Sequence, residues 1–383
     1  MIYFDSAATS FYRPPCVREA VAEAIERMGN AGRGAHGPAL EAARAIYRAR
    51  TLTASLFGVA DPGHVVFTSN ATEALNIAIG GLLAPGETAV TTAMEHNSVL
   101  RPLYRLQKQG VRLNVLPADR KGRVAPEAFE RAVVPGTRLV VVGHASNLCG
   151  NVQQIRALGA LCRERGALFV VDAAQTAGAL PIDMAKDHID VLCFSGHKGL
   201  LGPQGVGGLC LREGVLPRPL KVGGSGVQSF SHGHPACLPE ALEAGTANAH
   251  ALAGFAAALA YLQEQGVQAL HARETALCER LLAGVRALEG VEVYGDVDAS
   301  PRAAIVALNV KGMSSAAVAD KLWEKWNICV RAGAHCAPLA HEALGTAARG
   351  VVRFSLSPFN TPQQVDTAVV ALGELAGGQG DAA

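Results

Sequence analysis

The chain has 383 residues, of which 49% are hydrophobic and 17% are charged, and its formal net charge is +1. This length is typical of two domains, or of one large and one small domain. A charge near zero gives no support for a nucleic acid or an anionic membrane as partner, and no apolar run reaches the roughly 18 residues of a membrane span. The nine cysteines are scattered without a Cys-x-x-Cys pair, and the N-terminus has no basic segment. We therefore expect reduced thiols, a cytoplasmic location, and neither a disulfide framework nor a zinc site.

The first part of the chain alternates between apolar segments of strand length and segments with helical periodicity. After a short strand at residues 2–4, Pro14 and Pro15 open a helix that Gly29 closes. Further strands are expected at residues 65–68, 89–91, 112–116, 139–142, 168–172, 191–194 and 209–211. This alternation predicts an α/β fold in which a mainly parallel sheet has helices on both faces.

From about residue 250 the pattern changes to long helices with fewer strands. Strands are expected there at residues 291–294, 304–310 and 351–356. This pattern predicts a smaller α+β domain, which the N-terminal residues join. We expect a large domain at residues 13–248 and a small domain formed by residues 1–12 and 249–383.

A glycine-flanked lysine follows the apolar strand at residues 191–194. Lys198 lies in the run Ser195-Gly196-His197-Lys198-Gly199. Burial disfavours the charged form of lysine, and a lysine with a lowered pKa can form a Schiff base. Ser195 and His197 are polar groups that can hold a phosphate. By itself, this run also fits a surface turn with an ordinary lysine.

A carboxylate stands at the end of the preceding strand. Residues 168–171 are apolar and lead to Asp172, and open α/β sheets bind ligands at the carboxyl ends of such strands. An aspartate followed one strand later by Lys198 is the arrangement that pyridoxal 5'-phosphate requires. The carboxylate keeps the pyridine nitrogen protonated, and the lysine carries the aldehyde.

Three other strands also end in polar turns. Ala71 and Thr72 begin a helix whose free N–H groups suit a phosphate, although the polar residues before it could simply cap the helix. His96 follows another strand, where a structural histidine is the common alternative. Asn147 could either cap the next helix or contact a cofactor.

The C-terminal part contributes two side chains of chemical interest. Arg353 lies within a strand, where a buried charge needs a partner, either the carboxylate of an amino acid or an internal salt bridge. Cys336 lies in a loop of small residues, which we expect to be flexible, beside His335 and near Arg331. These neighbours favour a thiolate, whereas most cysteines are buried and inert. The histidines of the 223–236 loop lack further ligands, so no metal site is expected.

Three motifs together resemble the fold-type I, class V aminotransferases: Ser195-Gly196-His197-Lys198, Val171-Asp172-Ala173-Ala174-Gln175, and Arg331-Ala332-Gly333-Ala334-His335-Cys336-Ala337-Pro338. Within that family they are similar to the branch of cysteine desulfurases and selenocysteine lyases. The match is collinear from about Tyr3 to Thr361. It implies the fold of pyridoxal-phosphate-dependent transferases, with a seven-stranded sheet in the large domain.

The resemblance also implies roles for individual residues. The expected catalytic residues are Lys198, Cys336 and His96. Those expected around the cofactor are Ala71 and Thr72 at the phosphate, His96 against the ring, Asn147 and Gln175 at the phenolic oxygen, Asp172, Ser195, His197 and Lys198, and Thr246 from the partner subunit of a homodimer. Those expected around the substrate are Arg353 at its carboxylate, Arg331 in support, His36 and Asn147.

The implied activity converts L-cysteine to L-alanine. Lys198 removes the α-proton, and Cys336 attacks the substrate sulfur and keeps it as a persulfide for an unidentified acceptor protein. Ala334 and Leu200 depart from residues common in the family, so a selenocysteine lyase is an open alternative. Another class V aminotransferase or lyase is a further alternative, as is a weakly catalytic scaffold that binds the cofactor and hands sulfur between partners.

Overall fold

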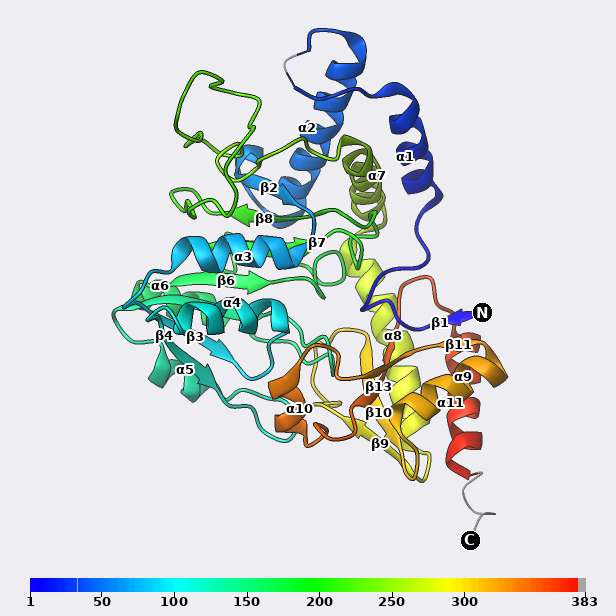
Figure 1. Ribbon diagram of the computed structural model, residues 1–383. Coiled ribbons are helices and arrows are strands. Elements are labelled where there is room, and N and C mark those ends of the chain that lie inside the picture. Colours follow the sequence, from blue (N-terminus) through cyan, green and yellow to red (C-terminus); the bar gives the residue numbers. More distant parts are fainter. Residues whose placement is uncertain (33, 378–383) are drawn as a thin grey trace.

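The computed structural model describes residues 1–32 and 34–377, and a seven-stranded sheet forms its centre (Figure 1). In spatial order its strands are β2 (Val65–Thr68), β8 (Gly207–Leu211), β7 (Val191–Ser195), β6 (Leu168–Asp172), β5 (Thr137–Gly143), β3 (Thr88–Thr92) and β4 (Arg112–Leu116). Strand β8 runs antiparallel to both of its neighbours, and the other strands of this sheet share one direction. The prediction of a mainly parallel sheet of seven strands is therefore confirmed.

Helices cover both faces of this sheet. They are α1 (Pro15–Arg27), α2 (Gly37–Phe57), α3 (Ala71–Leu82), α4 (Asn97–Gln107), α5 (Pro126–Ala132), α6 (Ile155–Arg165) and α7 (Ala249–Gln265), with a short 3-10 turn, η1 (Pro62–His64), before β2. Val141 and Val170 pack with α3 and α4 on one face, whereas Val140 and Val171 face a core that includes α2, α6 and α7. The strands read as continuous apolar runs because both of their faces are buried.

Helix α2 is the main element that the sequence patterns did not predict. It has 21 residues and lies between the helix that Gly29 closes and the strand at residues 65–68, where we expected no regular element. Its end signals are present in the sequence, because Pro38 lies in its first turn and Gly58 ends it in a left-handed conformation with a φ of 70°.

The C-terminal part of the chain builds a second, antiparallel sheet together with the N-terminus. Its strands are β12 (Arg331–Gly333), β13 (Val351–Ser355), β10 (Ile305–Val310) and β9 (Val291–Tyr294), and β1 (Ile2–Tyr3) pairs in parallel with β11 (Ile328–Cys329) beside it. The accompanying helices are α8 (Val267–Arg286), α9 (Ser315–Trp326), α10 (Pro338–Leu344) and α11 (Pro362–Gly377). Phe4 lies fully buried in the core of this part.

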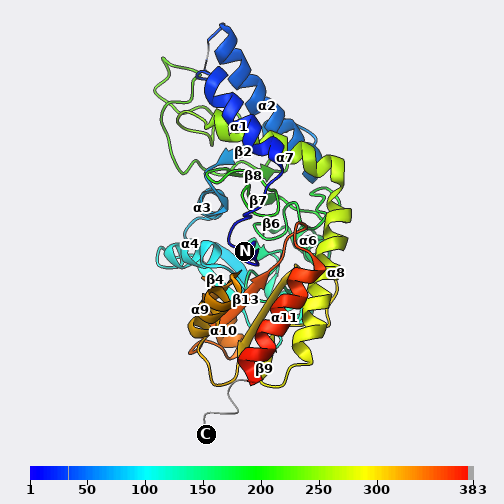
Figure 2. The same ribbon diagram turned by 90° about the vertical axis from the view of Figure 1, so that its right-hand side faces the viewer.

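The long helix α8 links the two parts and runs alongside the second sheet (Figure 2). Helix α7, by contrast, packs on α1 and α2. This packing favours a boundary at Gly266, between α7 and α8, over the predicted boundary after residue 248. The division of the chain into two domains stays a proposal. Within residues 1–32 and 34–377, no helix has both the length and the apolar character needed to cross a membrane.

Candidate active site

A cavity of about 340 Å³ lies at the carboxyl ends of the parallel strands, where the second sheet approaches the first. It brings together most of the residues that the sequence singled out. The predicted residues that line it are Ala71, Thr72, His96, Asn147, Asp172, Gln175, Ser195, His197, Lys198, Arg331, Cys336 and Arg353. These residues come from segments that are far apart in the sequence, so the cavity is a product of the tertiary fold.

Lys198 and Asp172 are two ionisable groups of opposite charge on the sheet side of the cavity. Burial lowers the pKa of Lys198 to about 8, although the negative charge of Asp172 opposes the change. Burial also raises the pKa of the Asp172 carboxyl, although the backbone N–H of Ala174, which donates a hydrogen bond to Oδ1 at 2.9 Å, favours its ionised form. The charge of each group therefore favours the ionised form of the other. A lysine with this pKa is partly deprotonated near neutral pH and can act as a base.

The start of α3 has the features of an anion site. Asn70 caps the helix by accepting from Glu73 N–H at 3.0 Å, so the simple cap that the sequence left open is present. The Ala71 N–H donates to Ser195 Oγ at 3.1 Å, and Thr72 Oγ1 lies 2.8 Å from Ser98 Oγ. Capping and anion binding are compatible here, because the cap uses the N–H of Glu73, whereas Thr72, in the same first turn, lines the cavity and brings its own N–H.

His96 is held in one tautomer. Its Nδ1 accepts from the backbone N–H of Ser98 at 3.0 Å, so the proton of the neutral ring is on Nε2. Burial, together with the positive charge of Lys198, lowers the pKa of His96 to about 4. The ring is therefore neutral at physiological pH, which suits a flat contact with an electron-poor aromatic ring better than a positively charged imidazole would.

Arg353 has an internal partner. Its side chain is almost completely buried, its Nη2 donates to Asp5 Oδ1 at 2.8 Å, and its Nη1 donates to the carbonyl of Asn147 at 2.9 Å. The structure therefore contains the internal salt bridge that was the alternative to a role in substrate binding. Because Arg353 also lines the cavity, Asp5 orients a guanidinium that a ligand can still reach.

The segment around Cys336 differs from the sequence expectation in two ways. The Cys336 carbonyl accepts from Asn97 N–H at 2.8 Å, and the His335 carbonyl accepts from Asn147 Nδ2 at 2.7 Å. The short loop that we expected to be flexible is therefore tied down at two successive residues. His335 is buried, and burial lowers its pKa to about 3, so it brings no positive charge to the thiol, contrary to our argument from adjacency. The Cys336 side chain itself is exposed.

Comparison with known proteins identifies the family. The model of the family "Aminotransferase class-V" matches residues 2–368. The chain belongs to the class-V aminotransferase family. A probable cysteine desulfurase from Methanothermobacter thermautotrophicus is 36% identical, over 98% of this chain and 95% of the relative. The resemblance that the motifs suggested is confirmed.

Solved structures of family members have the same fold. An apo structure of a cysteine desulfurase from Thermococcus onnurineus matches with a TM-score of 0.92 and 35% identity, over 98% of this chain and 95% of the other. The cysteine desulfurase CsdA from Escherichia coli, in an S-sulfonic acid form, matches with a TM-score of 0.86 and 26% identity, over 98% and 94%. The predicted fold class is confirmed.

Two predicted site residues lie outside this cavity. Thr246 is exposed and lines a different cavity, together with Gly245, Ser69 and Lys221. His36 is also exposed, at the start of α2. The family resemblance assigned Thr246 to the site of a partner subunit, and a position outside its own chain's cavity is compatible with that. The role of both residues stays a prediction.

Sequence reasoning missed the residues that hold the site together. The sequence analysis gave no role to Asp5 or to Asn97. Neither has a local signal, because each acts on a residue that is remote in sequence. A buried arginine does require a carboxylate partner. Asp5, an isolated acidic residue after an apolar strand, was one candidate for that partner.

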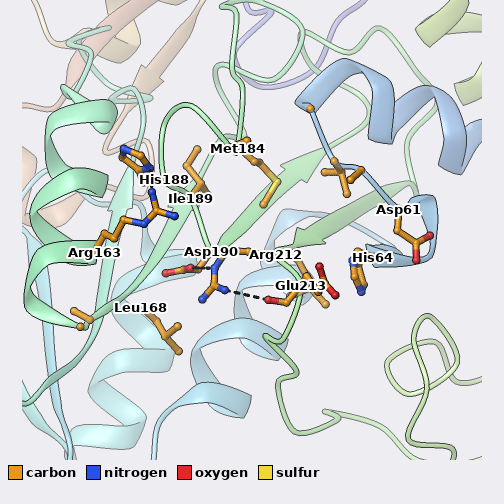
Figure 3. Close-up of a pocket in the computed structure, with 17 residues that line it drawn as sticks. Asp61, His64, Arg163, Leu168, Met184, His188, Ile189, Asp190, Arg212 and Glu213 are labelled. Carbon is orange, nitrogen blue, oxygen red and sulfur yellow. Dashed lines mark hydrogen bonds and ion pairs between the residues drawn. The ribbon is translucent and has the colours of Figure 1, made fainter.

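A second cavity, of about 620 Å³, lies at the other end of the strands (Figure 3). It reaches from the start of β6 to the end of β8 and contains none of the predicted site residues. Both of its arginines already have partners: Arg163 Nη1 lies 3.0 Å from His188 Nδ1, and Arg212 forms an ion pair with Asp190. The larger volume of this cavity therefore does not make it the better candidate for chemistry.

Proposed function

We propose that the protein is a pyridoxal-phosphate-dependent cysteine desulfurase, which converts L-cysteine to L-alanine and passes the sulfur to Cys336. The observation that carries the proposal is the placement of an exposed thiol in the same cavity as a half-buried lysine, a buried aspartate and a buried arginine. Membership of the class-V family and relatives named cysteine desulfurase support it.

The residues present fit pyridoxal phosphate. A buried carboxylate at Asp172 matches a protonated ring nitrogen, and Lys198 provides the amine for the aldehyde. The start of α3 and Ser195 provide donors for a phosphate, and the neutral ring of His96 provides a flat surface. When bound, the cofactor supplies an aldehyde for the substrate's amino group and a ring that withdraws electrons from its Cα.

The protein's own groups divide the remaining work. Arg353, oriented by Asp5, binds the carboxylate of the substrate, and Arg331 adds positive charge nearby. Lys198 Nζ takes the α-proton, which a pKa of about 8 allows near neutral pH. His96 stays neutral and holds its proton on Nε2, from which it can donate a hydrogen bond.

Cys336 takes the sulfur. Its thiolate Sγ attacks the substrate Sγ, a new S–S bond forms, and the Cβ–S bond of the substrate breaks with its electron pair left on carbon. The carbon fragment takes up protons and leaves as alanine, and Cys336 keeps the sulfur as a persulfide. Since Cys336 is exposed, a sulfur-acceptor protein can reach it. We further propose a homodimer, in which Thr246 of each subunit completes the site of the other.

The test compares the two exposed cysteines, Cys336 and Cys237. Cys336→Ala should lower alanine formation from L-cysteine by about 10³-fold or more, because the sulfur loses its acceptor. Cys237→Ser should keep the wild-type rate. After incubation with L-cysteine, mass spectrometry should find a persulfide on Cys336 and not on Cys237.

A Cys336→Ala variant that forms alanine at the wild-type rate would rule out this mechanism. Selenocysteine should be assayed in parallel, because selenium is the better leaving group. A variant that loses the cysteine reaction while keeping most of the selenocysteine reaction agrees with the thiol role. A wild-type protein that cleaves only selenocysteine would favour the lyase alternative.

A further inference from the structure

Asn147 contacts the small-domain side of the cavity through both its backbone and its side chain. The residue is buried in the loop after β5, with 7% of its surface exposed. Its Nδ2 donates to the carbonyl of His335 at 2.7 Å, and its own carbonyl accepts from Arg353 Nη1 at 2.9 Å. One residue of the sheet edge therefore fixes the residue before Cys336 and the guanidinium beside it.

The backbone at Cys336 needs such support. His335 and Cys336 have φ values of 50° and 56°, a left-handed conformation that residues with a Cβ seldom adopt. Two successive residues in this region persist only where the surroundings hold them. The contacts that do so are Asn147 on the His335 carbonyl, Asn97 on the Cys336 carbonyl, and His335 Nε2, which donates to the carbonyl of Arg331 at 3.1 Å.

The carboxamide of Asn147 has a second donor. A carboxamide nitrogen carries two N–H groups, and the His335 carbonyl accepts from one of them. Asn147 and His335 both line the 340 Å³ cavity. The second N–H is therefore placed to serve an acceptor oxygen of a group bound there, without releasing His335.

We propose that Asn147 is a positioning residue that couples occupancy of the cavity to the conformation of the Cys336 loop. One amide hydrogen holds the His335 carbonyl, and the other holds an oxygen of the bound cofactor. Binding then fixes the carboxamide and, through it, the loop that presents the thiol. The inference rests on the proposed function only for the identity of the group in the cavity; the hold on the loop is independent of it.

Hydrogen exchange tests this coupling without any turnover. Exchange of a peptide that covers residues 331–338 is measured in the full-length protein, with and without added pyridoxal phosphate. Without cofactor, Asn147→Ala should exchange this peptide about tenfold faster than the wild type, because a buried hydrogen bond is lost. Asn147→Asp, which keeps the shape but lacks the donor, should behave in the same way and covers the case in which the alanine variant misfolds.

Gln175→Ala is the matched control. Gln175 lines the same cavity and has the same expected cofactor contact, but its Nε2 donates to the carbonyl of Ala7 and not to the cysteine loop. It should leave exchange of residues 331–338 as in the wild type. Added cofactor should slow this exchange in the wild type and in Gln175→Ala. It should have little effect on the exchange in either Asn147 variant.

The proposal is overturned if both Asn147 variants exchange the peptide at the wild-type rate, or if added cofactor protects it equally in them. It is also overturned if Gln175→Ala accelerates exchange as much as Asn147→Ala does. Failure of the proposed function looks different: the wild type would then form no alanine from cysteine, while the exchange of its loop would still depend on Asn147.

Discussion

The sheet side of the cavity, with Lys198 and Asp172, is positioned by strand pairing, whereas the small-domain side, with Cys336 and Arg353, is positioned by single hydrogen bonds and one ion pair. Asp172 is in register with Cys193 on the next strand, and β7 leads to Lys198. On the small-domain side, Cys336 and Arg353 depend on contacts from Asn97, Asn147 and Asp5.

Lys198 and Asp172 also differ from Cys336 in their surroundings. Burial shifts the pKa of Lys198 down and that of Asp172 up, which is the environment that proton transfer requires. Cys336, in contrast, is exposed, as the proposed transfer of sulfur to another protein requires. The proposed function thus places proton transfer at a lysine whose pKa is lowered by its surroundings, and sulfur transfer at a thiol that another protein can reach.

Removal of the sheet-side lysine should have the largest effect. Lys198→Ala should lower turnover by about 10³-fold or more and abolish the visible absorbance of the lysine-bound cofactor, because both the base and the attachment point are lost. Spectra and alanine formation are measured on the same sample. Lys186→Ala, at an exposed lysine, should change neither. Borohydride reduction that links the cofactor to a different lysine would contradict the assignment.

Removal of the counter-ion on the small-domain side should have a smaller effect, on stability. Asp5→Asn leaves the buried Arg353 without a full negative charge, and we expect a loss of about 3 kcal/mol in the free energy of unfolding. The measurement is urea unfolding followed by circular dichroism. Asp366→Asn breaks the exposed pair with Arg280 and should cost less than about 1 kcal/mol. Equal, small losses in both variants would show that Asp5 contributes no more than a surface charge.

Glu274, a buried acid close to Lys198, provides a test of the sheet side through the pH dependence of stability. Glu274 in α8 lines a small cavity of about 40 Å³ that Lys198 also lines, and burial raises its pKa to about 8. The folded state therefore binds a proton that the unfolded chain releases above its pKa of 4.5, so this contribution to stability is complete below about pH 4.5 and is lost as pH rises toward 8.

Glu274→Gln removes this titration. We expect the variant to be more stable than the wild type by about 4 kcal/mol at pH 8, because the pKa rises from 4.5 to about 8 on folding and one pKa unit corresponds to about 1.4 kcal/mol. The difference at pH 5 should be below about 1 kcal/mol. Urea unfolding at the two pH values measures the change. Glu279→Gln, at an exposed position of the same helix, should show no such pH dependence. If the difference in the free energy of unfolding between Glu274→Gln and the wild type does not grow with pH, Glu274 is ionised in the folded protein.

The sequence alone determined the sheet and the residues at its carboxyl edge. Apolar runs that end in polar residues identified β2, β5, β6 and β7, and therefore the placement of Asp172, Ser195 and Lys198. This worked because strand direction and the two-sided burial of a parallel sheet are encoded locally, in runs of a few residues. The same locality explains why the sequence also found Cys336 and Arg353 as chemically suitable groups.

Only the tertiary structure decided how the small-domain side is held. Arg353 and its partner Asp5 are 348 residues apart, and Asn147 and His335 are 188 apart, so no local pattern links them. Burial likewise made His335 neutral, whereas its place beside Cys336 in the sequence had suggested a helpful charge. Hydrogen bonds and pKa values depend on which surfaces pack together, and that is settled when the two sheets meet around the cavity.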